Sequence, residues 1–272
     1  MTSAGGTADF ARYPFIEDGI AIFDREIQFY LAWLEFIAPM RRTGLSFVYP
    51  ELAETGREVH AEGAFDIALA AKLLAENRTP VVNDVRLAAG EQLIVVTGPN
   101  QGGKTTFART FGQLHHLGGL GCSVPGMDVR LGLCDRIYTH FEQRERLATS
   151  HGKLEDELVR LHDTLAEATA NSILVLNEIF DSTTYHDALY LSRRILARVL
   201  ELGARCVWVT FLDELSRYDE KVVSMVSSTL PGDPTARTYK IERRAADGLA
   251  YALSLAEKHG LSRTALLHRL PS

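Results

Sequence analysis

The chain has 272 residues, of which 46% are hydrophobic and 24% charged, and its formal net charge is −6. These values are typical of one large globular domain or two small ones, and they argue against a free-standing nucleic-acid-binding module, which would carry a basic surface. Three isolated cysteines stand in apolar runs, which indicates buried residues in a reducing compartment. We therefore expect a cytoplasmic protein, and no N-terminal segment predicts a signal peptide or a membrane span.

A first helix is predicted over residues 18–37, after a small and polar start. Apolar side chains recur there at alternating spacings of four and three residues: Phe23, Ile27, Tyr30, Leu34 and Ile37. This spacing places them on one side of a helix that packs against another helix. Fewer than three heptads are present, so a plain core helix and a coiled-coil lead-in both remain open. Residues 1–43 are thus expected to form a disordered start and a helical lead-in.

Strand and helix patterns alternate from residue 44 to residue 272, which we expect to be one domain. Strands are predicted at 45–49, 80–85, 93–97, 130–133, 136–141, 172–176 and 205–210, with an edge hairpin at 222–229 and 238–243. Helices are predicted at 64–75, 104–117, 153–168 and 184–202, with two short ones at 249–259 and 262–270. This alternation, with two continuously apolar strands, predicts an α/β fold with a mostly parallel sheet flanked by helices.

A glycine-rich loop follows the apolar strand at 93–97. It reads Gly98-Pro99-Asn100-Gln101-Gly102-Gly103-Lys104-Thr105-Thr106 and fits the pattern G-x-x-x-x-G-K-[ST] between a strand and a helix. Its glycines let successive backbone N–H groups converge on phosphate oxygens. Lys104 can reach the β- and γ-phosphates, the Thr105 hydroxyl can hold Mg²⁺, and the helix N-terminus favours the same anion. The loop therefore predicts a site for ATP with Mg²⁺, whereas a simple glycine turn would need neither side chain.

Two polar residues, Asn177 and Glu178, end the apolar strand at 172–176. In phosphate-loop NTPases an Asp at this strand end orients Mg²⁺, and the next Glu can polarise the attacking water. Asn177 keeps a carbonyl oxygen but lacks the negative charge, so its hold on Mg²⁺ should be weaker. Glu178 is the candidate general base, and a solvated strand-end carboxylate is the alternative.

Several of these segments together resemble the MutS mismatch-repair family. The loop with the preceding Thr97 is similar to that family's T-G-P-N-M-G-G-K-S-T, and shorter similarities lie at Val82-Asn83-Asp84, Val124-Pro125, 135–139, 172–178, 182–188 and 247–250. The resemblance runs from about Gly44 to the C-terminus and implies a phosphate-loop NTPase fold of the ABC/MutS type, with Asn83 beside the adenine. It also implies a homodimer in which a loop of the partner completes each ATP site.

The sequence departs from that family in its composite site. Phe211 stands where the family has a switch histidine, and Gly152 stands where it has the serine of the partner-supplied loop. Lys153 adjoins this loop position and could supply positive charge to the γ-phosphate in the partner's site. A solvated lysine paired with Glu157, one turn along the predicted helix, is the alternative.

Three functions remain open from the sequence. The first is slow Mg²⁺-dependent ATP hydrolysis by a MutS-like ATPase that acts on DNA through other domains or partner proteins, because no mismatch-binding domain precedes Gly44. The second, suggested by Asn177 and Phe211, is a nucleotide-dependent dimerisation module with little turnover. The third, a small-molecule kinase, is disfavoured because no acceptor-binding lid is recognisable. With a net charge of −6, the chain alone is expected to bind duplex DNA poorly.

Overall fold

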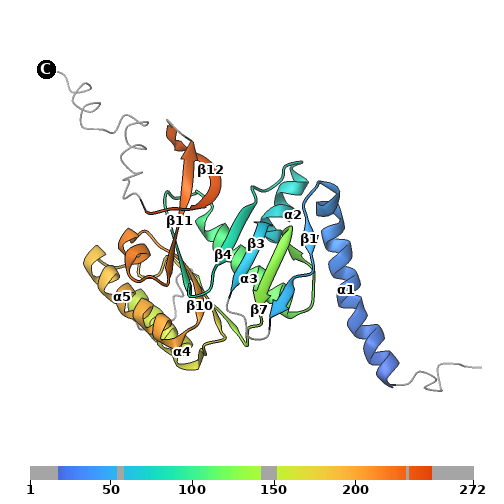
Figure 1. Cartoon of the computed structure of the whole chain (residues 1–272), viewed down its shortest axis with the longest axis horizontal. Helices are drawn as coiled ribbons and strands as arrows, with labels where there is room; N and C mark the ends of the chain where they lie inside the picture. The colour runs from blue at the N-terminus through green and yellow to red at the C-terminus, as the bar shows by residue number, and fades with distance from the viewer. Residues whose placement is uncertain (1–17, 54–57, 142–151, 231–232, 247–272) are drawn as a thin grey trace, which may run out of the picture.

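The computed structural model describes residues 18–53, 58–141, 152–230 and 233–246, and Figure 1 shows the arrangement of their helices and strands. These residues form an α/β fold with mixed sheets, which confirms the predicted class. The disordered start, the charged loop at 143–150 and the two short C-terminal helices of the sequence analysis lie outside the described residues. Within the described ranges, every helix is too short or too polar to cross a membrane.

A six-stranded sheet carries the glycine-rich loop. Its strands, in spatial order, are β12 (Asp233–Arg243), β11 (Val222–Leu230), β5 (Leu93–Thr97), β10 (Arg205–Val209), β9 (Ile173–Asn177) and β8 (Ile137–His140). Neighbouring strands from β11 to β8 pair in parallel, and β12 pairs antiparallel with β11 at the edge. The carboxyl ends of β5, β9 and β10 therefore meet at one edge of the sheet.

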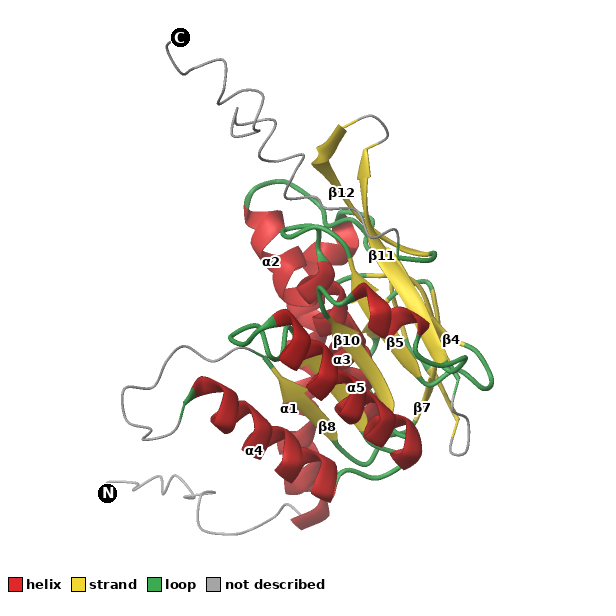
Figure 2. Ribbon diagram, turned by 90° about the vertical axis from the view of Figure 1, so that its left-hand side faces the viewer, coloured by secondary structure: helices red, strands yellow, loops and turns green. Residues whose placement is uncertain are grey.

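Helices cover both faces of this sheet, which explains its continuous apolar runs. Side chains that alternate along the strands pack on one face against α3 (Lys104–Gly119) and on the other against α4 (Lys153–Glu167) and α5 (Tyr185–Leu202). Ile94 and Val96 belong to the α3 side, whereas Leu93 and Val95 belong to the other. Figure 2 shows α4 and α5 in front of the sheet. Because every residue of β5, β9 and β10 is buried, these strands lack the usual alternation of apolar and polar residues.

A second, four-stranded sheet lies beside the first; the strands predicted at 80–85 and 130–133 belong to it, whereas its other two strands were missed from the sequence. It pairs β2 (Glu51–Ala53), β7 (Asp128–Gly132), β3 (Val59–Ala64) and β4 (Asn83–Leu87) in that order, and a short pair joins β1 (Phe47–Val48) to β6 (Val124–Pro125). Strand β3 does alternate buried Val59 and Ala61 with the more exposed His60 and Glu62. Its buried residues are mostly alanines, which bury little area, so the signal is weak.

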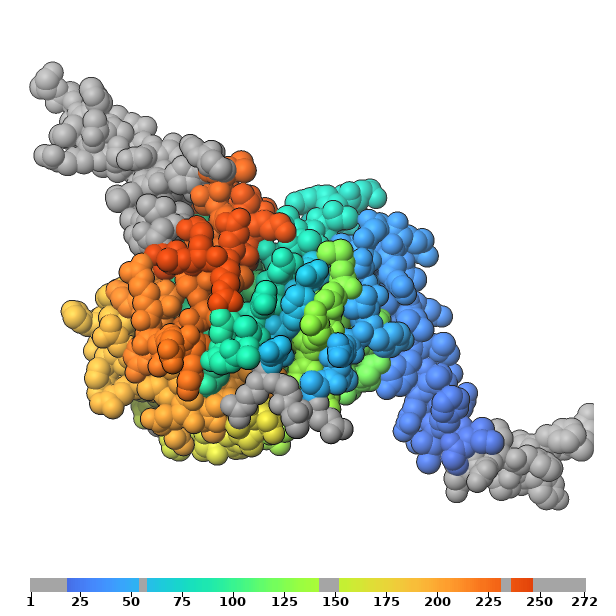
Figure 3. All heavy atoms as spheres, in the orientation of Figure 1, coloured from blue at the N-terminus to red at the C-terminus, as the bar shows by residue number. Residues whose placement is uncertain are grey.

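The first helix, α1 (Asp18–Arg42), runs five residues beyond its predicted end and contains Pro39. A proline inside a helix removes one hydrogen bond, but the neighbouring Ile37 and Met40 are fully buried against Phe47 and Phe65 and retain the helical path. The N-terminal part of α1 is exposed, and Figure 3 shows this helix projecting from one edge of the molecule. Only the C-terminal third of α1 therefore packs as a core helix.

Candidate nucleotide site

The glycine-rich loop turns sharply between β5 and α3, and its glycines are required by close neighbours. The backbone of Gly98 has a φ of 111°, and a Cβ built there would lie 3.0 Å from the backbone N and O of Ser227. A Cβ at Gly102 would lie 2.1 Å from Ser227 Oγ. The neighbouring Gly103 is also left-handed. The loop can therefore approach β11 only because side chains are absent at these positions.

Lys104, the first residue of α3, points its ammonium group into the curve of this loop. The side chain is 5% exposed, and Nζ donates hydrogen bonds to the carbonyl oxygens of Gly98 (3.0 Å) and Pro99 (3.2 Å) and to Oδ1 of Asn100 (3.1 Å). Glu178 Oε1 lies 3.8 Å from the same nitrogen. Burial lowers the pKa of Lys104, and the nearby Glu178 carboxylate opposes that shift. The result is a buried cation held by uncharged oxygens.

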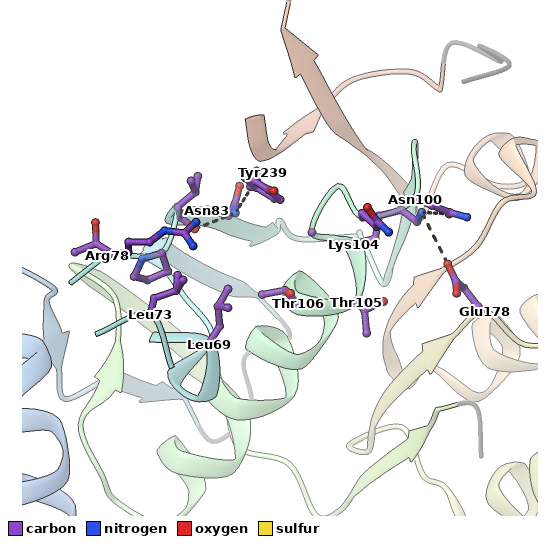
Figure 4. A pocket seen from close by; sticks show the side chains of 15 residues that line it. Leu69, Leu73, Arg78, Asn83, Asn100, Lys104, Thr105, Thr106, Glu178 and Tyr239 are labelled. Atoms are coloured by element: carbon purple, nitrogen blue, oxygen red, sulfur yellow. Dashed lines mark hydrogen bonds and ion pairs between the residues drawn. The ribbon is translucent and has the colours of Figure 1, made fainter. Parts of the chain in front are cut away.

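A cavity of about 470 Å³ opens beside the loop (Figure 4), a volume within the range of small-molecule sites. One end is lined by the loop from Asn100 to Thr106 and by Glu178. The other end is lined by Leu69 and Leu73 of α2 (Ile67–Ala75) and by Arg78–Val81. The cavity therefore has a polar end that contains Lys104 and a largely apolar end that contains Leu69 and Leu73. An elongated ligand with an anionic group at one end and a planar apolar group at the other would match both.

Asn83 and Tyr239 lie between the two ends and join the two sheets. Asn83 Nδ2 donates to the backbone oxygen of Tyr239 (3.1 Å), and its Oδ1 accepts from the backbone N–H of Ile241 (2.7 Å). The sequence analysis placed Asn83 at the ligand, and it does line the cavity. Its side-chain amide, however, holds β4 against β12, a role that the sequence did not suggest.

The strand-end pair, Asn177 and Glu178, lies at the carboxyl end of β9. Asn177 is 7% exposed and continues the strand face that packs against α3, and its Oδ1 has no hydrogen-bond partner among the described residues. Glu178 adopts a left-handed backbone conformation, with φ of 49°, and its carboxylate lines the cavity. The structure thus brings Glu178, Lys104 and Thr105 together at one cavity, whereas Asn177 does not line it and has one side-chain oxygen without a partner among the described residues.

Lys153 and Phe211 do not line the cavity. Lys153 Nζ donates to Oδ1 of Asp181 at 2.9 Å, a partner that the sequence analysis did not consider. Glu157, the partner it did consider, is buried and accepts a hydrogen bond from the backbone N–H of Phe180 (3.1 Å). Burial raises the pKa of Glu157, although the charge of Lys153 acts in the opposite direction. Phe211 is half exposed, and its ring lies 6.4 Å from that of Tyr185.

Two residues of the β11–β12 hairpin also hold the loop, and the sequence analysis missed both. Ser227 Oγ donates to the backbone oxygen of Gly102 (2.8 Å), and Arg237 Nε donates to that of Asn100 (3.1 Å). More than 120 residues separate each donor from its acceptor. No local pattern could have indicated these contacts. For α2 the sequence predicted a helix but did not indicate that Leu69 and Leu73 line a cavity.

A further group of metal-ligating side chains lies on the four-stranded sheet. His60 Nε2 is 3.5 Å from Glu62 Oε1 and 3.3 Å from Asp128 Oδ2. Arg130 also donates to this Asp128 oxygen at 2.9 Å. The guanidinium group already compensates the carboxylate, so the group forms an ion-pair network, and none of its members lines the cavity.

Comparison with known proteins shows which family this sequence resembles. Residues 94–267 match the family described as MutS domain V. The DNA mismatch repair protein MutS of Brevibacillus brevis is 30% identical over 183 residues, which cover 66% of this chain and 21% of that protein. MutS of Syntrophomonas wolfei is 27% identical over 221 residues, 79% of this chain and 25% of that protein. The chain thus spans about a fifth to a quarter of the length of these relatives.

Proposed function

The chain belongs to the MutS family, and from this membership we propose that it binds ATP in the cavity between the glycine-rich loop and α2. The observation that carries the proposal is Lys104. Burying an ammonium group is costly unless it is compensated, and among the described residues loop oxygens and one carboxylate at 3.8 Å compensate it. A triphosphate entering the loop would meet this cation, the backbone N–H groups and the N-terminus of α3 together.

The two ends of the cavity suit the two ends of ATP. The triphosphate would lie along Asn100–Thr106. The adenine would lie against the apolar wall made by Leu69, Leu73 and Pro80, with the Tyr239 ring as a further contact. Thr105 and Asn177 would hold Mg²⁺, because a hydroxyl and an amide carbonyl are both oxygen ligands of the kind this ion takes, and Asn177 Oδ1 has no partner among the described residues. Bound Mg²⁺ would neutralise part of the phosphate charge.

We propose that Glu178 is the general base for slow hydrolysis. Its carboxylate lines the cavity near Lys104, where it can accept a proton from a water molecule placed beyond the terminal phosphate. A second function is favoured by the neutral Asn177 and by Phe211, which cannot hydrogen-bond a phosphate. It is nucleotide-dependent dimerisation with little turnover. In both cases we propose a homodimer through the ATP sites, with Lys153 reaching the partner's site.

The biological setting that we propose follows from the names of the relatives, which are DNA mismatch repair proteins. This chain would serve DNA repair as the nucleotide-binding part, with DNA contacted by other domains or by partner proteins. A net charge of −6 supports indirect rather than direct contact with DNA.

Calorimetric titration of ATP with Mg²⁺ into the parent and the Lys104→Ala protein tests the ATP site. Charge-assisted contacts contribute about 1.5–3 kcal/mol each, so removal of the ammonium group should weaken binding roughly 10- to 150-fold or abolish it. Lys221→Ala, which removes an exposed lysine remote in sequence from the loop, is the matched control and should bind as the parent does. Equal ATP affinity in the parent and the Lys104→Ala protein would refute the assignment.

Phosphate release and oligomeric mass, measured with ATP at two protein concentrations, separate the two proposed functions. Turnover that rises with dimer content supports the ATPase. ATP-driven dimerisation without phosphate release supports the dimerisation module.

A further inference from the structure

Arg237 lies on β12 against the glycine-rich loop, in a hairpin that contacts this loop at three places. Its Nε donates to the backbone oxygen of Asn100 at 3.1 Å. On β11, Ser227 Oγ donates to the backbone oxygen of Gly102. The backbone of Tyr239 lies 3.8 Å from the position that a Cβ of Gly103 would occupy. The β11–β12 hairpin therefore packs along the loop and brings the guanidinium group of Arg237 to the backbone oxygen of Asn100, although Arg237 itself does not line the cavity.

The charge of Arg237 acts on the centre of the loop. The pKa of Lys104 is lowered mainly by burial, and the positive charge of Arg237 lowers it further. Two cations that face one short loop repel each other, and Glu178 Oε1, 3.8 Å from Lys104 Nζ, offsets only part of their charge. A polyanion bound in the loop would attract both side chains and offset the repulsion between them.

We propose that Arg237, bonded to the loop at Asn100, binds the terminal phosphates of the nucleotide held by the same chain. The inference rests on the proposed ATP site and adds a residue to it. A guanidinium group presents several N–H donors in a plane and can take two phosphate oxygens at once, as a lysine cannot. Its bond to Asn100 already orients it at the loop. Arg237 would thus add, within one chain, a second cation to the phosphate site.

A purely structural role for Arg237 makes a different prediction, and substitution can separate the two. Arg237→Gln keeps an N–H donor for the oxygen of Asn100 but removes the charge, whereas Arg237→Lys keeps the charge. If Arg237 binds phosphate, Arg237→Gln should weaken ATP binding about tenfold or more, ADP binding less, and AMP binding hardly at all. Arg237→Lys should lose only part of that affinity. If Arg237 only props the loop through its bond to Asn100, Arg237→Gln, which keeps that donor, should bind all three nucleotides as the parent does, whereas Arg237→Lys, which lacks it, should bind them more weakly.

The experiment is calorimetric titration of the parent and both variants with ATP, ADP and AMP in the presence of Mg²⁺. Arg243→Gln is the matched control, because it removes the same charge from β12 where the guanidinium pairs with Glu91 instead of the loop. Thermal unfolding without nucleotide checks that the variants are folded. A common factor for the three nucleotides, or parental ATP affinity in Arg237→Gln, would overturn the role of Arg237 while leaving the ATP site intact. A parent protein that binds no ATP would overturn the proposed function itself, and the role of Arg237 with it.

Discussion

Lys104 in the glycine-rich loop is 5% exposed and bonded to three oxygen atoms, whereas Glu178 at the end of β9 is 37% exposed and approaches that lysine only to 3.8 Å. The loop is held from outside by two side-chain hydrogen bonds of the β11–β12 hairpin. The strand-end pair has no comparable support: Asn177 Oδ1 lacks a hydrogen-bond partner among the described residues. The two regions thus differ in how firmly hydrogen bonds of the described residues fix their side chains.

This difference separates the binding of a phosphate from its cleavage. Binding needs backbone N–H groups and a cation in the correct place, and the loop contains both. Cleavage needs in addition a positioned base and charge on the metal and on the γ-phosphate. At the strand end these groups are a half-exposed carboxylate and a neutral amide. The comparison therefore favours a protein that binds nucleotide more readily than it hydrolyses it.

Glu178→Gln is expected to have the largest effect and would sharpen the comparison. Loss of a general base typically costs about 10²–10⁴-fold in rate, while the amide leaves the loop and Lys104 in place. ATP affinity should stay close to the parental value, and phosphate release should fall to background. Parallel calorimetry and phosphate-release assays measure the two quantities. Parental turnover in this variant would show that the strand-end carboxylate is a solvated group and that the base lies elsewhere.

The loop-bearing region should be sensitive to acid, because α3 contains the buried His115. Burial lowers the pKa of His115 to about 4, and a hydrogen bond from Nδ1 to the backbone oxygen of Phe111 (2.9 Å) opposes that shift only in part. The unfolded chain takes up this proton near pH 6.5, whereas the folded protein resists it until about pH 4. Stability is therefore present above pH 6.5 and is lost as the pH falls toward 4.

Between pH 7 and pH 5 this one residue should reduce the free energy of unfolding by about 2 kcal/mol. Urea unfolding of the parent and the His115→Leu protein at both pH values measures the effect, and the variant should lose correspondingly less stability. His162→Leu, at an exposed position of α4, is the matched control. Identical pH dependence in the parent and the His115→Leu protein would contradict the prediction.

Restoring the family's residues with Asn177→Asp and Phe211→His should reduce the difference between the two regions. A carboxylate forms hydrogen bonds and metal contacts about twice as strong as a neutral amide, so Mg²⁺ affinity in the presence of ATP should rise about five- to tenfold. Turnover should rise with it. The single variants indicate which residue is responsible. If neither Mg²⁺ affinity nor turnover rises, Asn177 and Phe211 are not the cause of weak hydrolysis, and the strand-end region has a different arrangement from that of the family.

Mixing two inactive variants tests the smallest expected effect, the reach of Lys153 into a partner's site. Lys104→Ala and Lys153→Ala proteins should each lack ATPase activity. Heterodimers would contain one complete site, with Lys104 from one chain and Lys153 from the other, so mixing should restore part of the activity. Absence of recovery, despite heterodimers detected by mass, would assign Lys153 a role within its own chain, where it bonds to Asp181.

Secondary structure was predictable where the local signal is strong. The glycine-rich loop, α3 and the apolar strands β9 and β10 lie where their patterns placed them, because fully buried strands and a glycine turn are encoded within a few consecutive residues. Two predictions failed for identifiable reasons. In the four-stranded sheet, β2 and β3 were missed because β2 has only three residues and β3 buries mostly small side chains. Helix α1 continues through Pro39 because tertiary packing of Ile37 and Met40 outweighs the cost of the proline.

The sequence by itself determined the residues of the candidate site that act over short distances: the loop from Gly98 to Thr106, with its cation, and the strand-end pair. Within each of these two motifs, residues that are neighbours in sequence are also neighbours in space, whereas the 3.8 Å approach of Glu178 to Lys104 depends on the pairing of the strands. Only the tertiary structure decided what surrounds them, including the Leu69 wall, the bond from Lys153 to Asp181 and the approach of Arg237 to Asn100. These contacts join segments up to 137 residues apart, and their geometry depends on how the sheets and helices pack.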